Sequence, residues 1–388
     1  MAIPGKRILI LNWRDTKHSA GGGAEVYNHE LAKIWTSQGH HVTIFCSQDH
    51  DNLKFEANEG INIIRQGGFV SVYFWAALYY LRHGRTRFDL IIDCQNGVPF
   101  FSPLYARVPV ICIVHHVHQR VFSKYLPKTS AALAKWLERQ AMPWVYRHHR
   151  YAAVSQSTKT AMIEELGIAS HRIEVVYNGV DHQLNQPGPK SEHPTIVYVG
   201  RLKAYKSVDT LLRAFALIAP QLPTAEVVIA GIGDDAPRLK QLAHTLGIWS
   251  RVKFTGHVSD KRRVSLMQSA WVVVNPSYTE GWGITTIEAY ACGTPVIASD
   301  VAGLRESVHA PHAGRLFPYG DAHALADALI ALVTDEQLRC QLIAQALDWA
   351  GRFDWQTSAQ RLLEIASQTE AATAKPHLHS QVTKSVVE

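Results

Sequence analysis

Short apolar runs alternate with longer segments of helical periodicity along most of the chain. In the first half, strands are predicted in KRILILNW and at His41–Cys46, Leu90–Asp93 and Val110–Val114. Helices are predicted at Ala24–Gln38, near Ala131–Arg150 and at Thr158–Leu166. Strands that alternate with helices in this way predict parallel sheets with helices on both faces.

The same alternation starts again after the polar stretch NQPGPKSEHP, which we interpret as a linker. Strands are predicted at Thr195–Val199, Val227–Ala230, Val252–Thr255, Trp271–Asn275 and Pro295–Ser299. Helices are predicted at Val208–Ala219, near Ser259–Gln268, from about Thr285 to Cys292 and near Trp355–Ser367. Two doubly wound halves predict a cleft at the carboxyl ends of their strands, where ligands bind.

These patterns predict two domains, an N-terminal one over residues 1–184 and a C-terminal one over residues 185–367. Periodicity alone leaves open whether the last helix crosses back to the first domain. Residues 368–388 lack apolar periodicity, and we expect them to be disordered.

The composition fits a globular enzyme, since 47% of the 388 residues are hydrophobic and 19% are charged. Charge is unevenly spread: residues 1–190 contain 21 Lys and Arg against 14 Asp and Glu, and the remainder contains 18 against 19. The basic first half suits an anionic partner, such as a phosphate, an acidic glycan or an anionic membrane surface. Solubility alone explains it equally well. We expect no nucleic-acid partner, and the oligomeric state stays open.

The five cysteines are widely spaced and form no CxxC pair, which is typical of a reducing cytoplasm. No run reaches the roughly 20 apolar residues that span a bilayer, and the start MAIPGKRILILNW lacks signal-peptide anatomy. We therefore expect a cytoplasmic protein.

Two segments combine aromatic and basic residues, as a segment lying in a membrane interface does. They are Phe69–Leu81, followed by Arg82, Arg85 and Arg87, and WVYRHHRY at 144–151. The alternative is a buried helix packed on the sheet. On the first interpretation the protein binds the inner face of the membrane peripherally, and the acceptor can be lipid-linked.

The segment NPSYTEGWGITTIEAYACGTPVIASD, residues 275–300, carries the strongest chemical signal. A predicted strand leads into a loop with Glu280 and Gly283, and a helix is predicted to begin near Ile284. The N-terminus of a helix offers N–H groups and the positive end of its dipole to a phosphate. Glu288 lies about one turn into this helix and can face the same cleft. Taken alone, the segment is equally explained by a capped helix after a buried strand.

The Glu280-x7-Glu288 spacing and its surroundings resemble the E-x7-E segment of retaining GT-B glycosyltransferases of family 4. Other blocks of that family stand in the same order: AGGGAE at 20–25, NGVD at 178–181, GRLKAYKSVDTLL at 200–212, GIGD at 231–234, FTGHVS at 254–259 and AGLRE at 302–306. The resemblance covers about residues 7–367. It implies an α/β protein of GT-B fold, with two Rossmann-like doubly wound parallel-sheet domains facing a central cleft.

The resemblance implies donor-binding roles for the matching residues of the second half. Arg201 and Lys206 match the basic pair that neutralises the donor diphosphate, and fixed cations there stabilise the charge that develops on the leaving group. Glu280 is implied to bind hydroxyls of the donor sugar, and Glu288 those of the nucleotide ribose. Backbone amides for the β-phosphate are implied at Gly283, Ile284 and Thr285.

In the first half, Gly22 and Gly23 belong to the triplet Gly21–Gly23, which resembles the family's flexible glycine loop over the diphosphate and the acceptor. The register of the family's glycine pair within this triplet is open. His115 follows the strand VPVICIV and occupies the position of a family histidine that points at the reacting sugar. The catalytic residues implied are therefore His115, Arg201, Lys206 and Glu280.

Two candidate metal sites are disfavoured. Around His115, adjacent strand residues face opposite sides, and no carboxylate or cysteine stands at ligand spacing to His116 and His118. The D-x-D string Asp49-His50-Asp51 holds a metal in another glycosyltransferase fold, but here a polar turn explains it better. We therefore expect neither a metal nor another cofactor.

Three positions depart from the family's pattern. Lys206-Ser207 stands where the family often has Lys-Gly, Ala302-Gly303 stands where it has paired glycines, and Trp282 replaces a Phe. These changes leave the phosphate chemistry intact and leave the shape of the sugar pocket open.

The resemblance implies a retaining glycosyltransferase that moves a sugar from a UDP- or GDP-linked donor to a glycan, lipid-linked or small-molecule acceptor. The motifs place no carboxylate as a covalent nucleophile, which favours front-face attack with the diphosphate accepting the proton. The alternatives are a sugar-nucleotide epimerase of the same fold and a nucleotide-sugar binding protein without transfer. A Rossmann dehydrogenase is disfavoured, because no complete GxGxxG follows the first strand.

Overall fold

The structure, a computed structural model, describes residues 5–19, 21–49, 52–84 and 86–374. The chain divides into two compact units: one combines residues 1–177 with 355–388, and the other is Asn178–Asp354. The stretch NQPGPKSEHP lies inside the second unit, where Trp271 Nε1 donates to Ser191 O at 2.9 Å. The chain passes from the first unit to the second between Tyr177 and Asn178, whereas the sequence predicts a boundary at 184/185, directly before this stretch.

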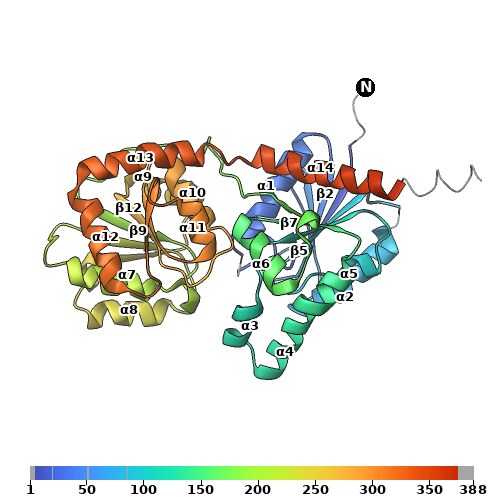
Figure 1. Cartoon of the computed structure of the whole chain (residues 1–388), viewed down its shortest axis with the longest axis horizontal. Helices are drawn as coiled ribbons and strands as arrows, with labels where there is room; N and C mark the ends of the chain where they lie inside the picture. The colour runs from blue at the N-terminus through green and yellow to red at the C-terminus, as the bar shows by residue number, and fades with distance from the viewer. Residues whose placement is uncertain (1–4, 20, 50–51, 85, 375–388) are drawn as a thin grey trace, which may run out of the picture. The chain divides into compact units, whose positions relative to one another are not determined.

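The first unit is built on an eight-stranded sheet of order β3-β4-β2-β1-β5-β6-β7-β8 (Figure 1). Its strands are β1 (Arg7–Leu11), β2 (His41–Cys46), β3 (Phe55–Asn58), β4 (Ile61–Arg65), β5 (Leu90–Gln95), β6 (Val110–Val114), β7 (Arg150–Ala153) and β8 (Ile173–Val175). Its helices are α1 (Gly23–Ser37), α2 (Ser71–Tyr79), α3 (Gln119–Tyr125), α4 (Lys128–Trp136), α5 (Met142–Val145), α6 (Gln156–Leu166) and α14 (Trp355–Ala374). All described strand pairs of this sheet are parallel except β3 with β4.

The second unit is built on a six-stranded parallel sheet of order β11-β10-β9-β12-β13-β14. Its strands are β9 (Thr195–Val199), β10 (Glu226–Ala230), β11 (Val252–Gly256), β12 (Val272–Asn275), β13 (Val296–Ser299) and β14 (Gly314–Phe317). Its helices are α7 (Val208–Ile218), α8 (Ala236–Thr245), α9 (Asp260–Ser269), α10 (Ile284–Ala291), α11 (Ala302–Val308), α12 (Ala322–Thr334) and α13 (Glu336–Ala350).

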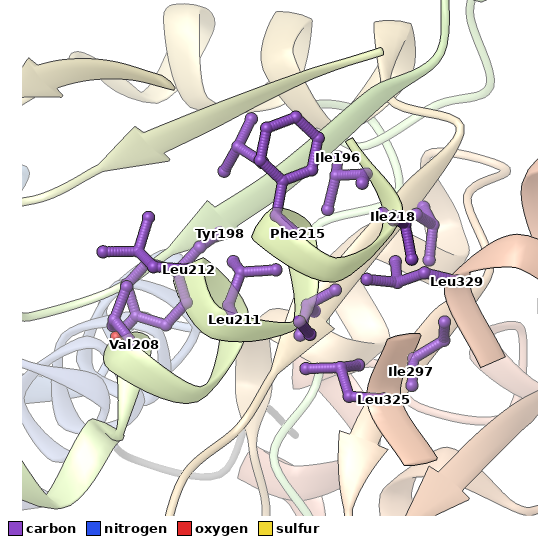
Figure 2. Close-up of a cluster of buried hydrophobic side chains, with 14 of the residues drawn as sticks. Ile196, Tyr198, Val208, Leu211, Leu212, Phe215, Ile218, Ile297, Leu325 and Leu329 are labelled. Atoms are coloured by element: carbon purple, nitrogen blue, oxygen red, sulfur yellow. The ribbon is translucent and has the colours of Figure 1, made fainter. Parts of the chain in front are cut away.

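The core of the second unit shows why these segments form helices on a sheet. Apolar residues of α7 recur every three or four positions and therefore form one stripe, at Val208, Leu211, Leu212, Phe215 and Ile218. Figure 2 shows this stripe together with Ile196 and Tyr198 of β9, Ile297 of β13, and Leu325 and Leu329 of α12. Each fully buried Leu or Phe contributes about 1.5–3 kcal/mol of transfer free energy. This packing holds the start of α7 and the loop before it in place.

The last helix belongs to the first unit. Trp35 Nε1 of α1 donates to Ala359 O at 3.1 Å, and α14, drawn in red in Figure 1, runs beside α1. The helix continues through residues 368–374, which were expected to be disordered, because the segment QTEAATA contains good helix formers that extend an already packed helix. The rest of the predicted tail, residues 375–388, lies outside the described residues.

The prediction of a helix near Ala131–Arg150 is wrong at its C-terminal end. The observed helical segment consists of α4, a π-helical turn at Leu137–Ala141 and the short α5, and it ends at Val145. Residues 150–153 instead form β7, which pairs with β6 and β8 inside the sheet. A strand this short gives little periodicity, so only its pairing in the folded chain identifies it.

Candidate functional site

The donor-binding candidates of the second unit lie where the strand order of its sheet reverses. From β9 the chain continues outward to β10 and β11 on one side, and then returns to β12, β13 and β14 on the other. The loops after β9 and β12 therefore flank a topological switch point, which is where doubly wound sheets bind ligands. The first loop carries Arg201 and Lys206, and the second carries Glu280 and Gly283.

Glycines in the loop after β10 allow it to lie close to the backbone of the loop after β9. A Cβ on Gly231 would lie 1.8 Å from Gly200 O, and a Cβ on Gly233 would lie 2.0 Å from Leu202 O. The GIGD block is therefore explained by close backbone packing. Within the loop after β9, Arg201 Nη2 donates to the hydroxyl of Tyr205 at 2.8 Å, which fixes the direction of the guanidinium.

Lys206 and Glu280 are brought together by the two loops. The Lys206 Nζ atom and a Glu280 carboxylate oxygen form an ion pair, and Ser277 Oγ donates to the same carboxylate oxygen at 2.9 Å. Tyr278 N also donates to Tyr205 O at 2.8 Å, so the loops are joined through their backbones. Burial on its own would lower the pKa of Lys206, but the charge and hydrogen bond of Glu280, together with Tyr205, outweigh it and the pKa is raised.

Two of the departures from the family pattern have a structural explanation in these loops. A Cβ on Gly303 would lie 2.2 Å from Glu280 O, so the single glycine of Ala302-Gly303 is the one the loop requires. Ser207 adopts the left-handed conformation that Gly favours, with φ of 49°, and its Oγ lies 3.0 Å from the hydroxyl of Tyr319. Both loops thus keep the backbone that glycine would give.

The start of α10 offers backbone amides beside the same loops. Gly283 precedes the helix with φ of 86°, and its carbonyl accepts from Thr286 N at 2.9 Å. The amides of Ile284 and Thr285 belong to the first turn, where N–H groups have no partner within the helix. A phosphate can take these donors and the positive end of the helix dipole.

Glu288 forms an ion pair that no sequence motif indicates. Its Oε1 lies 2.5 Å from Nη1 of Arg263, which reaches it from the neighbouring helix α9. The Glu288 and Arg263 side chains are 12% and 18% exposed. The Arg263 pKa is raised, because the nearby Glu288 and Asp260 charges outweigh the effect of burial. Arg263 is 25 positions from Glu288, so its role emerges only from the packing of α9 on α10.

Trp282 does not shape the surface of this site. Its side chain is buried and packs edge-to-face on Phe353, with ring centroids 5.1 Å apart. The exchange of a Phe for Trp at this position is therefore accommodated in the interior of the second unit.

In the first unit, the glycine triplet is held by a buried carboxylate. Gly22 precedes α1, and its amide donates to Glu25 Oε2 at 2.6 Å. Glu25 Oε1 also lies 3.3 Å from Nε of Arg14, in the segment after β1. Gly22 is thus the N-cap of α1 and Gly23 its first residue, which gives the triplet a defined register in this fold.

His115 follows β6 in the first unit, as the sequence predicts for its place along the chain. Its Nε2 atom is buried and has no hydrogen-bond partner among the described residues, and its ring lies edge-to-face on Tyr27 at 5.3 Å. Burial, with a smaller effect of His118, lowers the pKa of His115 to about 3. The imidazole is therefore neutral at physiological pH and can donate or accept a hydrogen bond without carrying charge.

A buried carboxylate next to this loop was missed by the sequence reasoning. Glu138, in the π-helical turn, accepts from His118 N at 2.7 Å, Gln95 Nε2 at 2.8 Å and Gln119 Nε2 at 2.7 Å. It thus joins the end of β5 to the loop after β6. No carboxylate was expected near His118, yet Glu138 Oε1 lies 3.4 Å from its Nδ1. Glu138 lies in a π-helical turn, and such turns are frequent at functional sites. The sequence pattern does not reveal this turn, so it could not indicate the role of Glu138.

No metal site is found in the part of the chain that the structure describes. It contains no group of three or more His, Cys, Asp or Glu residues that could hold a metal ion. In the D-x-D string, Asp49 Oδ2 accepts from Ser19 N at 2.6 Å, a contact with the segment that follows β1. His50 and Asp51 lie outside the described residues.

The two aromatic and basic segments each have a buried and an exposed face. In α2, Val72 and Ala76 are buried, whereas Phe74, like Phe69 and Val70 just before the helix, is exposed. Trp144 of α5 is 62% exposed and, with Trp136, Phe101 and Leu104, lines an apolar groove of about 630 Å³ that we call the tryptophan groove. Arg85 lies outside the described residues. Among those described, no helix is long and apolar enough to cross a membrane.

Comparison with known proteins agrees with this architecture. Residues 180–349 match the family model described as Glycosyl transferases group 1, and residues 21–184 match that of Glycosyltransferase Family 4. A phosphatidyl-myo-inositol mannosyltransferase of Mycolicibacterium smegmatis is 32% identical over 373 residues, which cover 91% of this chain and 92% of that protein.

Two solved structures share the fold. A sucrose-phosphate synthase from Thermosynechococcus elongatus superimposes with a TM-score of 0.81 at 21% identity, covering 95% of this chain and 100% of that one. The structure of Anabaena HepE in complex with UDP-glucose gives a TM-score of 0.76 at 22% identity, covering 94% and 100%.

Two doubly wound parallel-sheet units with these structural neighbours define the GT-B fold. The chain belongs to glycosyltransferase family 4, and it is a glycosyltransferase.

Proposed function

We propose that this enzyme is a retaining glycosyltransferase that moves a hexosyl group from a UDP- or GDP-linked sugar to a hydroxyl of a lipid-linked or glycan acceptor. The observation that carries the proposal is the switch point of the second unit. There, Arg201, the Lys206–Glu280 pair and the first amides of α10 stand on two loops joined by the Tyr278–Tyr205 hydrogen bond. This combination suits a diphosphate flanked by a sugar.

The donor is proposed to bind with its diphosphate between the cations and the helix end. Arg201, Lys206 and the amides of Ile284 and Thr285 would stabilise the negative charge that builds on the β-phosphate as the glycosidic bond breaks. Glu280 would bind the sugar hydroxyls and Glu288 the ribose hydroxyls. The HepE complex contains UDP-glucose, which supports a uridine donor as the first to test.

The transfer is proposed to proceed on one face of the sugar. The acceptor oxygen forms a bond to the anomeric carbon on the side from which the diphosphate departs, and the bond from that carbon to the β-phosphate oxygen breaks. The acceptor proton goes to the departing phosphate oxygen. Charge stabilisation by side chains and amides suffices for this step, so we propose that no metal is required.

The first unit supports an acceptor at an anionic membrane. Residues 94–163 contain nine Lys and Arg but a single acidic residue, Glu138, which is buried. The tryptophan groove lies within this segment and exposes Trp136 and Trp144. Cations around exposed tryptophans complement an anionic lipid bilayer, and the mannosyltransferase of M. smegmatis has a phosphatidyl lipid in its name. We therefore propose peripheral docking of this unit on anionic bilayers.

The donor test is a thermal-shift screen of UDP, GDP and ADP with their sugars, followed by NMR of the product formed from the best donor. A raised Tm with one nucleotide and an α-linked product from an α-linked donor are expected. An inverted anomer would overturn retention, and epimerised or hydrolysed donor without glycoside would overturn transfer.

The membrane test is sedimentation with vesicles of phosphatidylglycerol or of phosphatidylcholine. Binding to the anionic vesicles at low salt, weakened in Trp136→Ser and Trp144→Ser, is expected. No binding at low salt would overturn the docking proposal and leave the proposed reaction untouched.

A further inference from the structure

The carboxylate of Glu288 has its closest ionic contact at one oxygen. Its Oε1 lies 2.5 Å from Nη1 of Arg263, and no described residue donates a hydrogen bond to its Oε2. A carboxylate has about four lone-pair sites, so the ion pair occupies part of the group and leaves the rest for a ligand. The arrangement gives Glu288 a fixed direction before any donor binds.

Arg263 is itself restrained. On α9, its guanidinium lies 3.3 Å from Asp260 Oδ1, one turn earlier on the same helix, in addition to its contact with Glu288. Its neighbour Arg262 is exposed and makes no described side-chain contact, so the two arginines differ sharply in environment. The Ser259 hydroxyl, which accepts from Arg262 N at 3.4 Å, caps the helix that carries both.

We propose that Arg263 is a positioning residue for the ribose of the donor, acting through Glu288. It fixes Oε1 so that Oε2 and the remaining lone pairs face the two ribose hydroxyls in one orientation. The inference rests on the proposed ribose-binding role of Glu288 and adds a second residue to it, from a helix outside the loops that carry the other donor-binding residues.

The physical reason is preorganisation. A glutamate side chain loses rotamer freedom when it binds a ligand, and a guanidinium that already holds it removes part of that cost. The positive charge of Arg263 also lies beside this buried carboxylate, and hydrogen bonds from hydroxyls to a charged carboxylate are stronger than those to a neutral group. Loss of Arg263 therefore weakens ribose recognition without touching the diphosphate or the base.

The test compares ribose with a sugar that lacks both hydroxyls. Isothermal titration measures binding of UDP or GDP, whichever the wild-type protein binds, and of its 2′,3′-dideoxy analogue. In Arg263→Met, affinity for the ribonucleotide falls about tenfold, the effect of a lost charged hydrogen bond, while affinity for the dideoxy analogue changes little. Arg263→Lys retains part of the preference, since an ammonium can hold one oxygen. Arg262→Met, the matched control, behaves as wild type.

The outcomes separate this inference from the function on which it rests. If Glu288→Ala loses the ribose preference and Arg263→Met keeps it, Arg263 does not position Glu288 and the inference fails alone. If Glu288→Ala keeps the preference as well, the ribose role of Glu288 fails and takes the inference with it. Should Arg263→Met not fold, as judged by its Tm without ligand, Arg263→Lys decides: an unchanged ribose preference there overturns the inference.

Discussion

Lys206 and Glu280, 74 positions apart in the sequence, form an ion pair between the loops that follow β9 and β12. Both side chains are 15% exposed. The pair was not foreseen, because the sequence suggested separate roles for the two residues, one on the diphosphate and one on the sugar. In the structure the two side chains pair with each other, so the loss of either leaves the other without this ionic partner.

Lys206→Ala and Glu280→Ala are each expected to lower kcat/KM for the donor about 10²- to 10³-fold, as loss of one preorganised charge does. Because the residues form a pair, the double variant is expected to lose far less than the product of the two single losses. Steady-state kinetics of the four proteins measure this coupling.

Lys203→Ala provides the control for this pair. Lys203 stands on the same loop but pairs with the exposed Asp234, so its kinetics are expected to stay within about twofold of wild type. Fully additive losses in Lys206→Ala and Glu280→Ala would show that the pair does not act as a unit.

Gly303→Ala is expected to displace the Glu280 loop, because the added Cβ would meet Glu280 O at 2.2 Å. We expect a loss of about 1–3 kcal/mol in the free energy of unfolding, typical of overpacking, together with a raised KM for the donor. Gly351→Ala is the matched control in the same unit, since its Cβ finds ordinary contacts at 3.4 Å. Equal denaturation midpoints and KM values for the two variants would contradict the close approach.

Much of the fold could be predicted from the sequence, because its strands are short apolar runs buried inside sheets. The predicted strands at His41–Cys46, Val110–Val114 and Thr195–Val199 have the same bounds in the structure. The pair β3 and β4 was missed, since β3 forms the edge of the sheet and both strands mix polar with apolar residues. Such strands are specified by pairing between distant segments rather than by their own pattern.

The candidate site likewise has features that could be predicted from the sequence and features that could not. Loops and the helix start near Glu280 could be located from the sequence, because glycines and an apolar run mark them. Partners such as Arg263 for Glu288, or Gln95 for Glu138, arise from contacts across 25 and 43 positions. No local spacing encodes them, and the roles of the donor-binding residues remain predictions for the experiments above.

Chelation is expected to leave transfer unaffected. Arg201, Lys206 and the amides at the start of α10 supply the positive charge that a divalent ion would otherwise bring to the diphosphate. Initial rates after dialysis against EDTA should match those with added Mg²⁺ or Mn²⁺ within about twofold. A rate that collapses with EDTA and returns with one of these ions would show that the metal-free proposal is wrong.

Glu138→Gln is expected to destabilise the first unit although it preserves shape. Oε1 of Glu138 accepts from both Gln95 and His118 N, and Oε2 accepts from Gln119. The side-chain NH2 group of glutamine would face one of these N–H donors, and the unfavourable contact costs about 1–3 kcal/mol of unfolding free energy. Urea denaturation measures the change, with exposed Glu164→Gln as control. A variant as stable as wild type would mean that the network is not needed to join the end of β5 to the loop after β6.

The stability of the first unit is expected to fall in mild acid because His115 resists protonation. Its pKa is lowered to about 3 by burial, whereas in the unfolded chain it stays near the ordinary value of 6.5. Between these values the unfolded state binds a proton that the folded state does not, so this contribution is complete above pH 6.5 and is lost as the pH falls toward 3. Each pH unit costs up to about 1.4 kcal/mol.

His115→Phe removes this proton uptake while filling the space beside Tyr27. Urea denaturation at pH 7 and pH 5.5 should therefore show a smaller loss of unfolding free energy in the variant than in the wild-type protein, by up to about 1.4 kcal/mol. His116, whose pKa burial also lowers to about 3, should give a similar result in His116→Phe. An acid sensitivity unchanged by His115→Phe would mean that the imidazole reaches solvent and takes up its proton in the folded state.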